Sequence, residues 1–181
     1  MIDRTWTTLL GNCSVCFTGL LFLVAGSHKL FAQSRFSGFL ADYRLVPARW
    51  TGVVSWVIIG AEFAVPLALV STQTRDAGGV LAISLLLGYA LGMAINLYRG
   101  RRQIECGCGG PPQPLSGSLL VRNGCLAAVT LLIFMPRTGL TSVASAAMGF
   151  AAGLVLWSVY AFISQVLSNQ SQLNQLVGEH S

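Results

Sequence analysis

The sequence predicts an all-α fold: a polytopic membrane helical bundle of about five transmembrane helices, with a short interfacial helix after the first. Hydrophobic residues make up 54% of the 181 residues, and charged residues only 9%, against about 25% in ordinary globular chains. Mean hydropathy is +0.67, so the excess apolar surface must face lipid. Lipid offers the backbone no hydrogen-bond partners, and long apolar runs are therefore expected to be helices.

Five apolar runs are long enough to cross a bilayer, which takes about 20 helical residues. Each is bounded by arginine, proline or a polar cluster, and the runs cover residues 9–31, 50–72, 78–98, 118–135 and 142–167. We predict a four-helix core followed by an additional C-terminal helix. Residues 1–167 are thus expected to form a single integral membrane domain, and residues 168–181 a polar C-terminal tail.

The first run has an alternative interpretation as a secretory signal peptide. Arg4 precedes the apolar stretch, which ends in the small residues Ala25-Gly26-Ser27, as a cleavable signal would. We expect the helix to be retained, because His28-Lys29-Leu30 continue the segment and nothing downstream resembles a soluble mature domain.

Residues 33–47 predict a short helix that lies in the membrane interface. Four apolar residues recur at the spacing of one helix face: Phe36, Phe39, Leu40 and Tyr43. Such a one-sided apolar pattern is typical of an amphipathic helix at a membrane surface. A hydrophobic loop packed over the bundle is the alternative.

The basic character of the chain does not indicate nucleic acid. A net charge of +5 would suggest such a partner for a soluble protein, but here the arginines lie between apolar runs, where they set membrane topology. We therefore expect the lipid bilayer as a partner and no nucleic acid.

The loop between the third and fourth runs carries the candidate chemistry. It reads Arg99-Gly100-Arg101-Arg102-Gln103-Ile104-Glu105-Cys106-Gly107-Cys108. The two cysteines have three interpretations: a structural disulfide, a metal site or a redox-active dithiol. A disulfide between them needs a bent backbone, which Gly107 permits, but its small ring would stabilise little and exchange readily.

Redox exchange is the favoured interpretation of Cys106 and Cys108. Zinc would need two further ligands, and both histidines lie elsewhere, at His28 and His180. Arginines just before the cysteines would lower a thiol pKa, although membrane topology explains these arginines equally well.

Two ionisable residues inside apolar runs are further candidates. Glu62 lies mid-way along the second run and Arg122 just inside the fourth, where a charge is costly unless it is paired or faces a cavity. The alternative is a purely structural ion pair of Glu62 with Lys29 or Arg122. Cys125, three residues after Arg122, is expected to share its face and lie near the same interior, unless it is a small apolar filler.

A second thiol pair, Cys13 and Cys16, lies near the start of the first run. The spacing places both on one helix face and matches thioredoxin-type dithiols, but it lacks the βαβ context of that motif. Five spans place this pair on the membrane face opposite Cys106, so an electron relay across the membrane is conceivable.

Several of these motifs together resemble the methylamine utilisation protein MauE family. The resemblance rests on Asn96-Leu97-Tyr98-Arg99-Gly100-Arg101, on Cys106-Gly107-Cys108-Gly109 and on Leu120-Val121-Arg122-Asn123. Two further motifs, Gly26-Ser27-His28-Lys29-Leu30 and Gly60-Ala61-Glu62, are similar to the wider group of DoxX-related membrane proteins. The resemblance runs from the first span through the fourth.

The resemblance implies a multi-pass protein of the bacterial inner membrane. Such a protein would serve maturation of the small, disulfide-rich subunit of methylamine dehydrogenase, beside a thioredoxin-like partner of the MauD type. Cys106 and Cys108 carry over as the redox pair, with supporting positions at Asn96, Arg99, Arg122 and Asn123. Similarity to helical-bundle thiol oxidants such as DsbB and vitamin K epoxide reductase is looser. No cofactor follows from the residues, and a quinone is the one candidate retained.

The orientation of the Cys106 loop is predicted in two conflicting ways. One membrane side carries three basic residues: Arg4, Arg75 and Arg137. The side of the loop carries seven: Lys29, Arg35, Arg44, Arg49, Arg99, Arg101 and Arg102. The positive-inside rule then puts the loop in the cytoplasm, whereas stable disulfide transfer belongs to the oxidising periplasm. We favour the periplasm on the resemblance.

Three functions remain in competition. The leading hypothesis is a membrane thiol-disulfide exchange factor. The second is a non-enzymatic scaffold that holds a thioredoxin-like partner and its client. The third is a small transporter that uses Glu62 and Arg122, although the two related halves with broken helices typical of transporters are not evident in the sequence.

Overall fold

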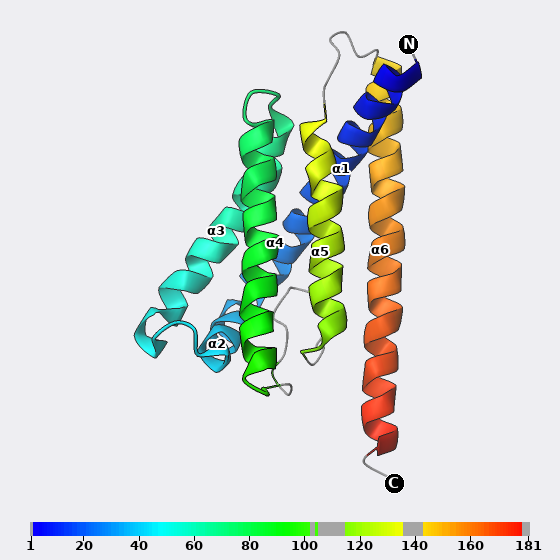
Figure 1. Cartoon of the computed structure of the whole chain (residues 1–181). Coiled ribbons are helices and arrows are strands. Elements are labelled where there is room, and N and C mark those ends of the chain that lie inside the picture. Colours follow the sequence, from blue (N-terminus) through cyan, green and yellow to red (C-terminus); the bar gives the residue numbers. More distant parts are fainter. Residues whose placement is uncertain (1, 102–103, 105–114, 136–142, 179–181) are drawn as a thin grey trace.

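The computed structural model describes residues 2–101, 104, 115–135 and 143–178. Within these ranges every regular element is a helix (Figure 1), which confirms the all-α prediction. The long helices are α1 (Ile2–Phe31), α3 (Thr51–Val70), α4 (Arg75–Tyr98), α5 (Gly117–Leu131) and α6 (Val143–Gly178). The short ones are α2 (Gln33–Tyr43) and two 3-10 turns, η1 (Ala48–Trp50) and η2 (Leu132–Phe134).

The long helices confirm the predicted multi-pass membrane protein. All five are long and apolar enough to span a bilayer. Their ends differ from the hydropathy limits: α1 already begins at Ile2, and α6 continues to Gly178 through much of the polar tail. A helix needs only its own backbone hydrogen bonds, so polar residues extend it beyond the stretch that hydropathy detects.

The helices run alternately between two ends of the bundle. The start of α1, the α3–α4 turn and the start of α6 lie at one end, while α2, the end of α4 and the start of α5 lie at the other (Figure 1). Helix α1 packs on α3 and α6, and α4 packs on α3 and α5. The larger apolar core joins α1, α3, α4 and α5 and includes Phe17, Phe22, Val65, Leu86, Leu126 and Ile133.

Helix α2 confirms the predicted short helix after the first span. It ends at Tyr43, and Arg44 follows in the left-handed conformation (φ 48°). Phe36 on its apolar face is buried, and Gln33 Nε2 donates a hydrogen bond to Ser55 Oγ of α3 at 2.9 Å. The apolar face of α2 is thus turned toward the bundle.

Helix α6 lies at the edge of the bundle and packs mainly on α1 (Figure 1). Two glycines four residues apart, Gly149 and Gly153, allow this close approach, as small residues do between membrane helices. A Cβ at Gly153 would lie 2.6 Å from the main-chain oxygen of Cys13 and 2.6 Å from the Cβ of Cys16. Cys13 and Cys16 therefore lie at the contact between α1 and α6.

This packing predicts that Gly153→Leu separates α6 from α1. The added side chain meets the backbone of α1, which cannot rotate away, and overpacking of this kind costs about 1–3 kcal/mol. Gly60→Leu is the matched control, because a Cβ at Gly60 meets nothing within 4 Å. Thermal unfolding in detergent should show a lower melting temperature for Gly153→Leu only; equal melting temperatures would contradict the packing.

Candidate functional site

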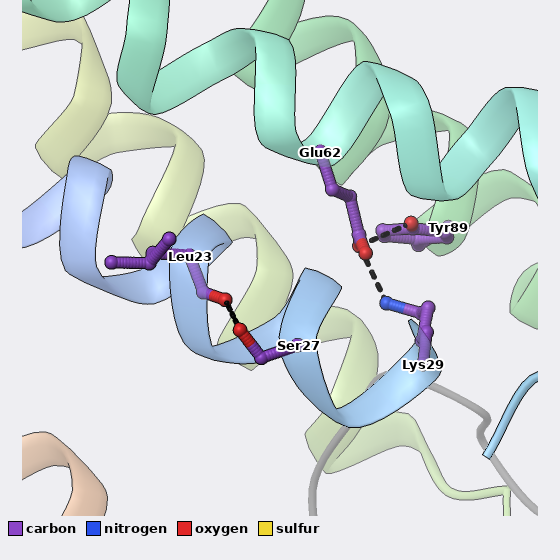
Figure 2. A network of polar contacts seen from close by, with 5 residues as sticks. All are labelled: Leu23, Ser27, Lys29, Glu62 and Tyr89. Carbon is purple, nitrogen blue, oxygen red and sulfur yellow. Dashed lines mark hydrogen bonds and ion pairs between the residues drawn. The ribbon is translucent and has the colours of Figure 1, made fainter. Parts of the chain in front are cut away.

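A buried ion pair joins α1 and α3. Lys29 Nζ lies 2.5 Å from Glu62 Oε1, and the two residues are only 3% and 0% exposed. The Tyr89 hydroxyl of α4 donates a hydrogen bond to the same carboxylate oxygen at 2.6 Å. Figure 2 shows Lys29 and Tyr89 converging on Glu62 from two different helices. One carboxylate therefore fixes three helices relative to each other.

Aromatic rings complete the surroundings of the ammonium group. Lys29 Nζ lies 5.3 Å from the centroid of the Phe36 ring on α2 and 5.0 Å from that of the Tyr89 ring. Both distances lie within the range of cation–π attraction. We call Lys29, Phe36, Glu62 and Tyr89 the Lys29 cluster; it brings one residue from each of α1, α2, α3 and α4 together.

Glu62 retains one oxygen with hydrogen-bonding capacity. Its Oε2 is buried and forms no hydrogen bond with any of the described residues. A buried carboxylate oxygen without a bond is costly, so it marks a position where a proton or a ligand group would be stabilised.

The structure shows which of the two cations pairs with Glu62. Glu62 pairs with Lys29, and Arg122 lies half-buried on α5. The prediction for Cys125 is wrong, because this thiol is exposed. The buried face of α5 is formed by Leu119, Asn123, Leu126, Ala127 and Thr130. Cys125 lies off that face, since each helical residue rotates the side chain by about 100°.

Two of the predicted supporting residues are buried amides on neighbouring helices. Asn96 of α4 is 0% exposed and Asn123 of α5 is 3% exposed. Asn96 Nδ2 donates to the Gly92 carbonyl at 3.1 Å, and its main-chain oxygen accepts from the Arg101 amide at 3.0 Å. Asn96 Oδ1 and Asn123 Nδ2 form no hydrogen bond within the described part of the chain. Both amides lie on the helices that flank the cysteine loop.

Cys106 and Cys108 themselves lie outside the described residues, but both ends of their loop are described. The Leu115 amide donates to the Ile104 carbonyl at 3.1 Å, so the two ends lie side by side. Ile104 packs against a small buried apolar cluster formed by Met93, Leu115 and Leu119. The loop therefore starts and finishes at one fixed point on the bundle.

The arginines before the cysteines have different surroundings. Arg101 Nη1 donates to the main-chain oxygen of Asp42 at 2.9 Å and so ties the end of α4 to α2. Arg99 is exposed and follows the last turn of α4. Arg102 lies outside the described residues.

An apolar cavity of about 290 Å³ lies between α2, α3 and α4. Its walls include Phe36, Phe39, Tyr43, Ile58, Gly88 and Tyr89. Tyr43 and Tyr89 also pack against the apolar cluster at the ends of the cysteine loop. Burial raises the pKa of the Tyr43 phenol to about 12, so this wall stays neutral at physiological pH. The cavity thus lies between the Lys29 cluster and the base of the loop.

Tyr89 and the cavity were not predicted from the sequence. The sequence does contain a periodicity that points to Tyr89: this residue lies seven positions before Asn96 and therefore on the same face of α4. A second signal is Glu62, whose burial in lipid requires a polar partner on an adjacent helix. The cavity depends on three helices and has no local signature.

The second thiol pair lies away from this site. Cys13 and Cys16 are half-buried free thiols, and about 24 Å of helix axis separates Cys13 from Lys29. The pair lies in the first half of α1, and α1 starts at the end of the bundle opposite the end of α4 and the start of α5 (Figure 1). Cys13 and Cys16 are therefore remote from Lys29 and the rest of the Lys29 cluster.

These features define a small polytopic helical membrane protein with a buried ion pair, an adjoining apolar cavity and a cysteine-bearing loop. The family model described as methylamine utilisation protein MauE matches residues 6–136. The chain belongs to this family. Helix α6 begins only after the matched region.

Curated relatives agree with this assignment. The chain is 37% identical over 148 residues to the methylamine utilization protein MauE of Paracoccus denitrificans, with 80% of each chain covered. It is 33% identical to the proteins of the same name from Paracoccus versutus and from Methylorubrum extorquens, again with 80% of each chain covered. No solved structure matches the chain.

The buried pair predicts a strong dependence of each charge on the other. Lys29→Met leaves the Glu62 carboxylate unpaired, which should cost about 3–5 kcal/mol. The double variant Lys29→Met/Glu62→Gln removes both charges and keeps an acceptor for the Tyr89 hydroxyl, so it should recover most of that loss. Unfolding in detergent and protein abundance in membranes measure both effects.

The matched control for this pair is Arg35→Met, which removes an exposed cation from α2 and should change stability little. A double variant as unstable as Lys29→Met alone would show that the charges do not stabilise each other.

Proposed function

We propose that this protein is a membrane thiol-disulfide exchange factor of methylamine utilisation, in which Cys106 and Cys108 cycle between dithiol and disulfide. The relatives named above are methylamine utilization proteins, and the family model covers most of the chain. By the family resemblance, the client is the small subunit of methylamine dehydrogenase and the partner is a thioredoxin-like protein. The protein acts in the bacterial inner membrane.

The observation that carries the proposal is the anchoring of the cysteine loop. The Leu115–Ile104 backbone hydrogen bond joins the two ends of the loop, and the Arg101 contact with Asp42 ties the end of α4 to α2. A ten-residue segment, 105–114, lies between fixed ends. The thiol pair is thereby tethered to one end of the bundle, which gives its exchange with a client a rigid support.

The exchange step moves two electrons and two protons from the client to the Cys106–Cys108 disulfide and needs no third reactant. A client thiolate attacks one sulfur of the Cys106–Cys108 disulfide, breaks that S–S bond and forms a mixed disulfide. The second client thiol then displaces the remaining cysteine. The client has lost two electrons and two protons and carries the new disulfide, and Cys106 and Cys108 have become thiols.

We place the loop in the periplasm, where client disulfides persist. The charge count that opposes this placement includes cations with internal partners. Lys29 is paired with Glu62, Arg101 is bonded to the Asp42 carbonyl, and on the other side Arg75 Nη2 donates to Asn12 Oδ1 at 3.3 Å. Setting these three residues aside leaves five cations on the loop side against two on the other. The charge count therefore still favours the cytoplasm, and the placement in the periplasm rests on the family resemblance.

Replacing either cysteine tests the proposal directly. We predict that Cys106→Ser or Cys108→Ser abolishes active methylamine dehydrogenase in cells, while the membrane protein stays at normal abundance, because so short a disulfide loop contributes little stability. Cys125→Ser is the matched control, since that thiol is exposed on α5, and it should leave maturation unchanged. Normal maturation in the Cys106 and Cys108 variants would favour a scaffold, and loss of the protein itself would indicate a structural disulfide.

Orientation is tested by labelling. In a variant with Cys13, Cys16 and Cys125 replaced by Ser, a membrane-impermeant maleimide added to reduced, intact spheroplasts should label Cys106 or Cys108. Labelling only after permeabilisation would place the loop in the cytoplasm, as the positive-inside rule predicts.

A further inference from the structure

The cavity between α2, α3 and α4 has the dimensions and chemistry of a small-ligand site. Its volume of about 290 Å³ is close to the lower end of the range for such sites, about 300–1,000 Å³. Four of its wall residues are aromatic: Phe36, Phe39, Tyr43 and Tyr89. Stacked and edge-on aromatic contacts favour a flat ring over a flexible chain.

Glycines keep the α4 wall of the cavity open. Gly88 and Gly92, one turn apart, both line it. A Cβ at Gly88 would meet nothing within 4 Å, and one at Gly92 would lie 3.5 Å from both Tyr43 and Leu45. Any larger side chain at Gly88 would therefore occupy the cavity without striking the backbone.

One residue that lines the cavity is hydrogen-bonded to a group that can bind protons. Tyr89 lines the cavity, and its hydroxyl is bonded to Glu62, whose Oε2 is buried without a bond to any described residue. A pocket for a lipid acyl chain needs no such groups. A ligand that is reduced by two electrons takes up two protons, and the Lys29 cluster provides donors and an acceptor beside it.

The cavity also adjoins the base of the cysteine loop. Tyr43 and Tyr89 pack against the same apolar cluster as Ile104, and Ile104 is bonded to Leu115 across the loop. An oxidant bound in the cavity would therefore lie close to the place where the loop joins the bundle.

We propose that this cavity binds the ring of an isoprenoid quinone, which reoxidises the Cys106 and Cys108 thiols. The inference rests on the proposed function for its electron donor. The two thiols lose two electrons and two protons and form the S–S bond; the quinone gains both electrons and both protons and leaves as the quinol. The isoprenoid tail lies in the surrounding lipid, and the membrane supplies fresh quinone.

The test is quinone binding to the full-length protein, measured by calorimetric titration with decylubiquinone in detergent. Gly88→Leu fills the cavity and should weaken binding by about tenfold or more, which corresponds to about 1.4 kcal/mol. Gly60→Leu is the matched control: it places the same side chain in open space on α3 and should bind as the wild type does. If Gly88→Leu lowers the melting temperature more than Gly60→Leu does, the smaller Gly88→Val replaces it.

The outcomes separate this inference from the proposed function. Binding should persist in the Cys106→Ser/Cys108→Ser variant, because none of the described residues that line the cavity is a cysteine. Oxidation of thiols by added decylubiquinone should occur only in the wild type. Absence of binding, equal binding by the Gly88 variant, or displacement of the quinone by an equal concentration of oleate would overturn the quinone site. A different outcome is that quinone binds the wild type but not the Gly88 variant, while Cys106 and Cys108 are dispensable for maturation. This result would overturn the exchange function and the reoxidation of these thiols, and the quinone site itself would stand.

Discussion

The pairing of Lys29 with Glu62 constrains the rest of this bundle. Each charge costs several kcal/mol to remove from water, and neither is tolerated in the apolar interior of a membrane protein unless it is paired. The pair forms only when α1 and α3 are in register, and the Tyr89 hydroxyl adds α4 to the same carboxylate. Phe36 of α2 then covers the ammonium group. A few polar atoms thereby specify the arrangement of four helices, where apolar packing alone would permit sliding.

The site at one end of the bundle follows from this arrangement. Because Phe36 is held against Lys29, the apolar face of α2 is turned inward and forms a wall of the cavity. The end of α2 in turn accepts the hydrogen bond from Arg101, which positions the start of the cysteine loop. Helix α6, by contrast, contacts mainly α1 through Gly149 and Gly153 and lies beyond the region matched by the family model. It is an addition to the four-helix core and does not line the cavity.

The sequence predicted those features that depend on local pattern. Hydropathy located the five spans, and the spacing of Phe36, Phe39, Leu40 and Tyr43 predicted α2 and its apolar face. The sequence left open whether Glu62 pairs with Lys29 or Arg122, because a pairing between two helices depends on which helices are neighbours in space. The prediction for Cys125 is wrong, because half-buried Arg122 does not mark the centre of the buried face of α5, which lies near Asn123. The cavity and the role of Tyr89 require three helices at once and have no local signature.

The proposed exchange function requires Cys106 and Cys108 to cycle between dithiol and disulfide in the cell. The most direct measurement is to trap their thiol state in cells growing on methylamine, by acid quenching and alkylation with a mass-tagged maleimide before and after reduction. We expect both forms to be present, and the dithiol form to accumulate when respiration is stopped, because the quinone pool then becomes reduced. A pair found in one form only, unchanged when respiration is stopped, would contradict the proposed function.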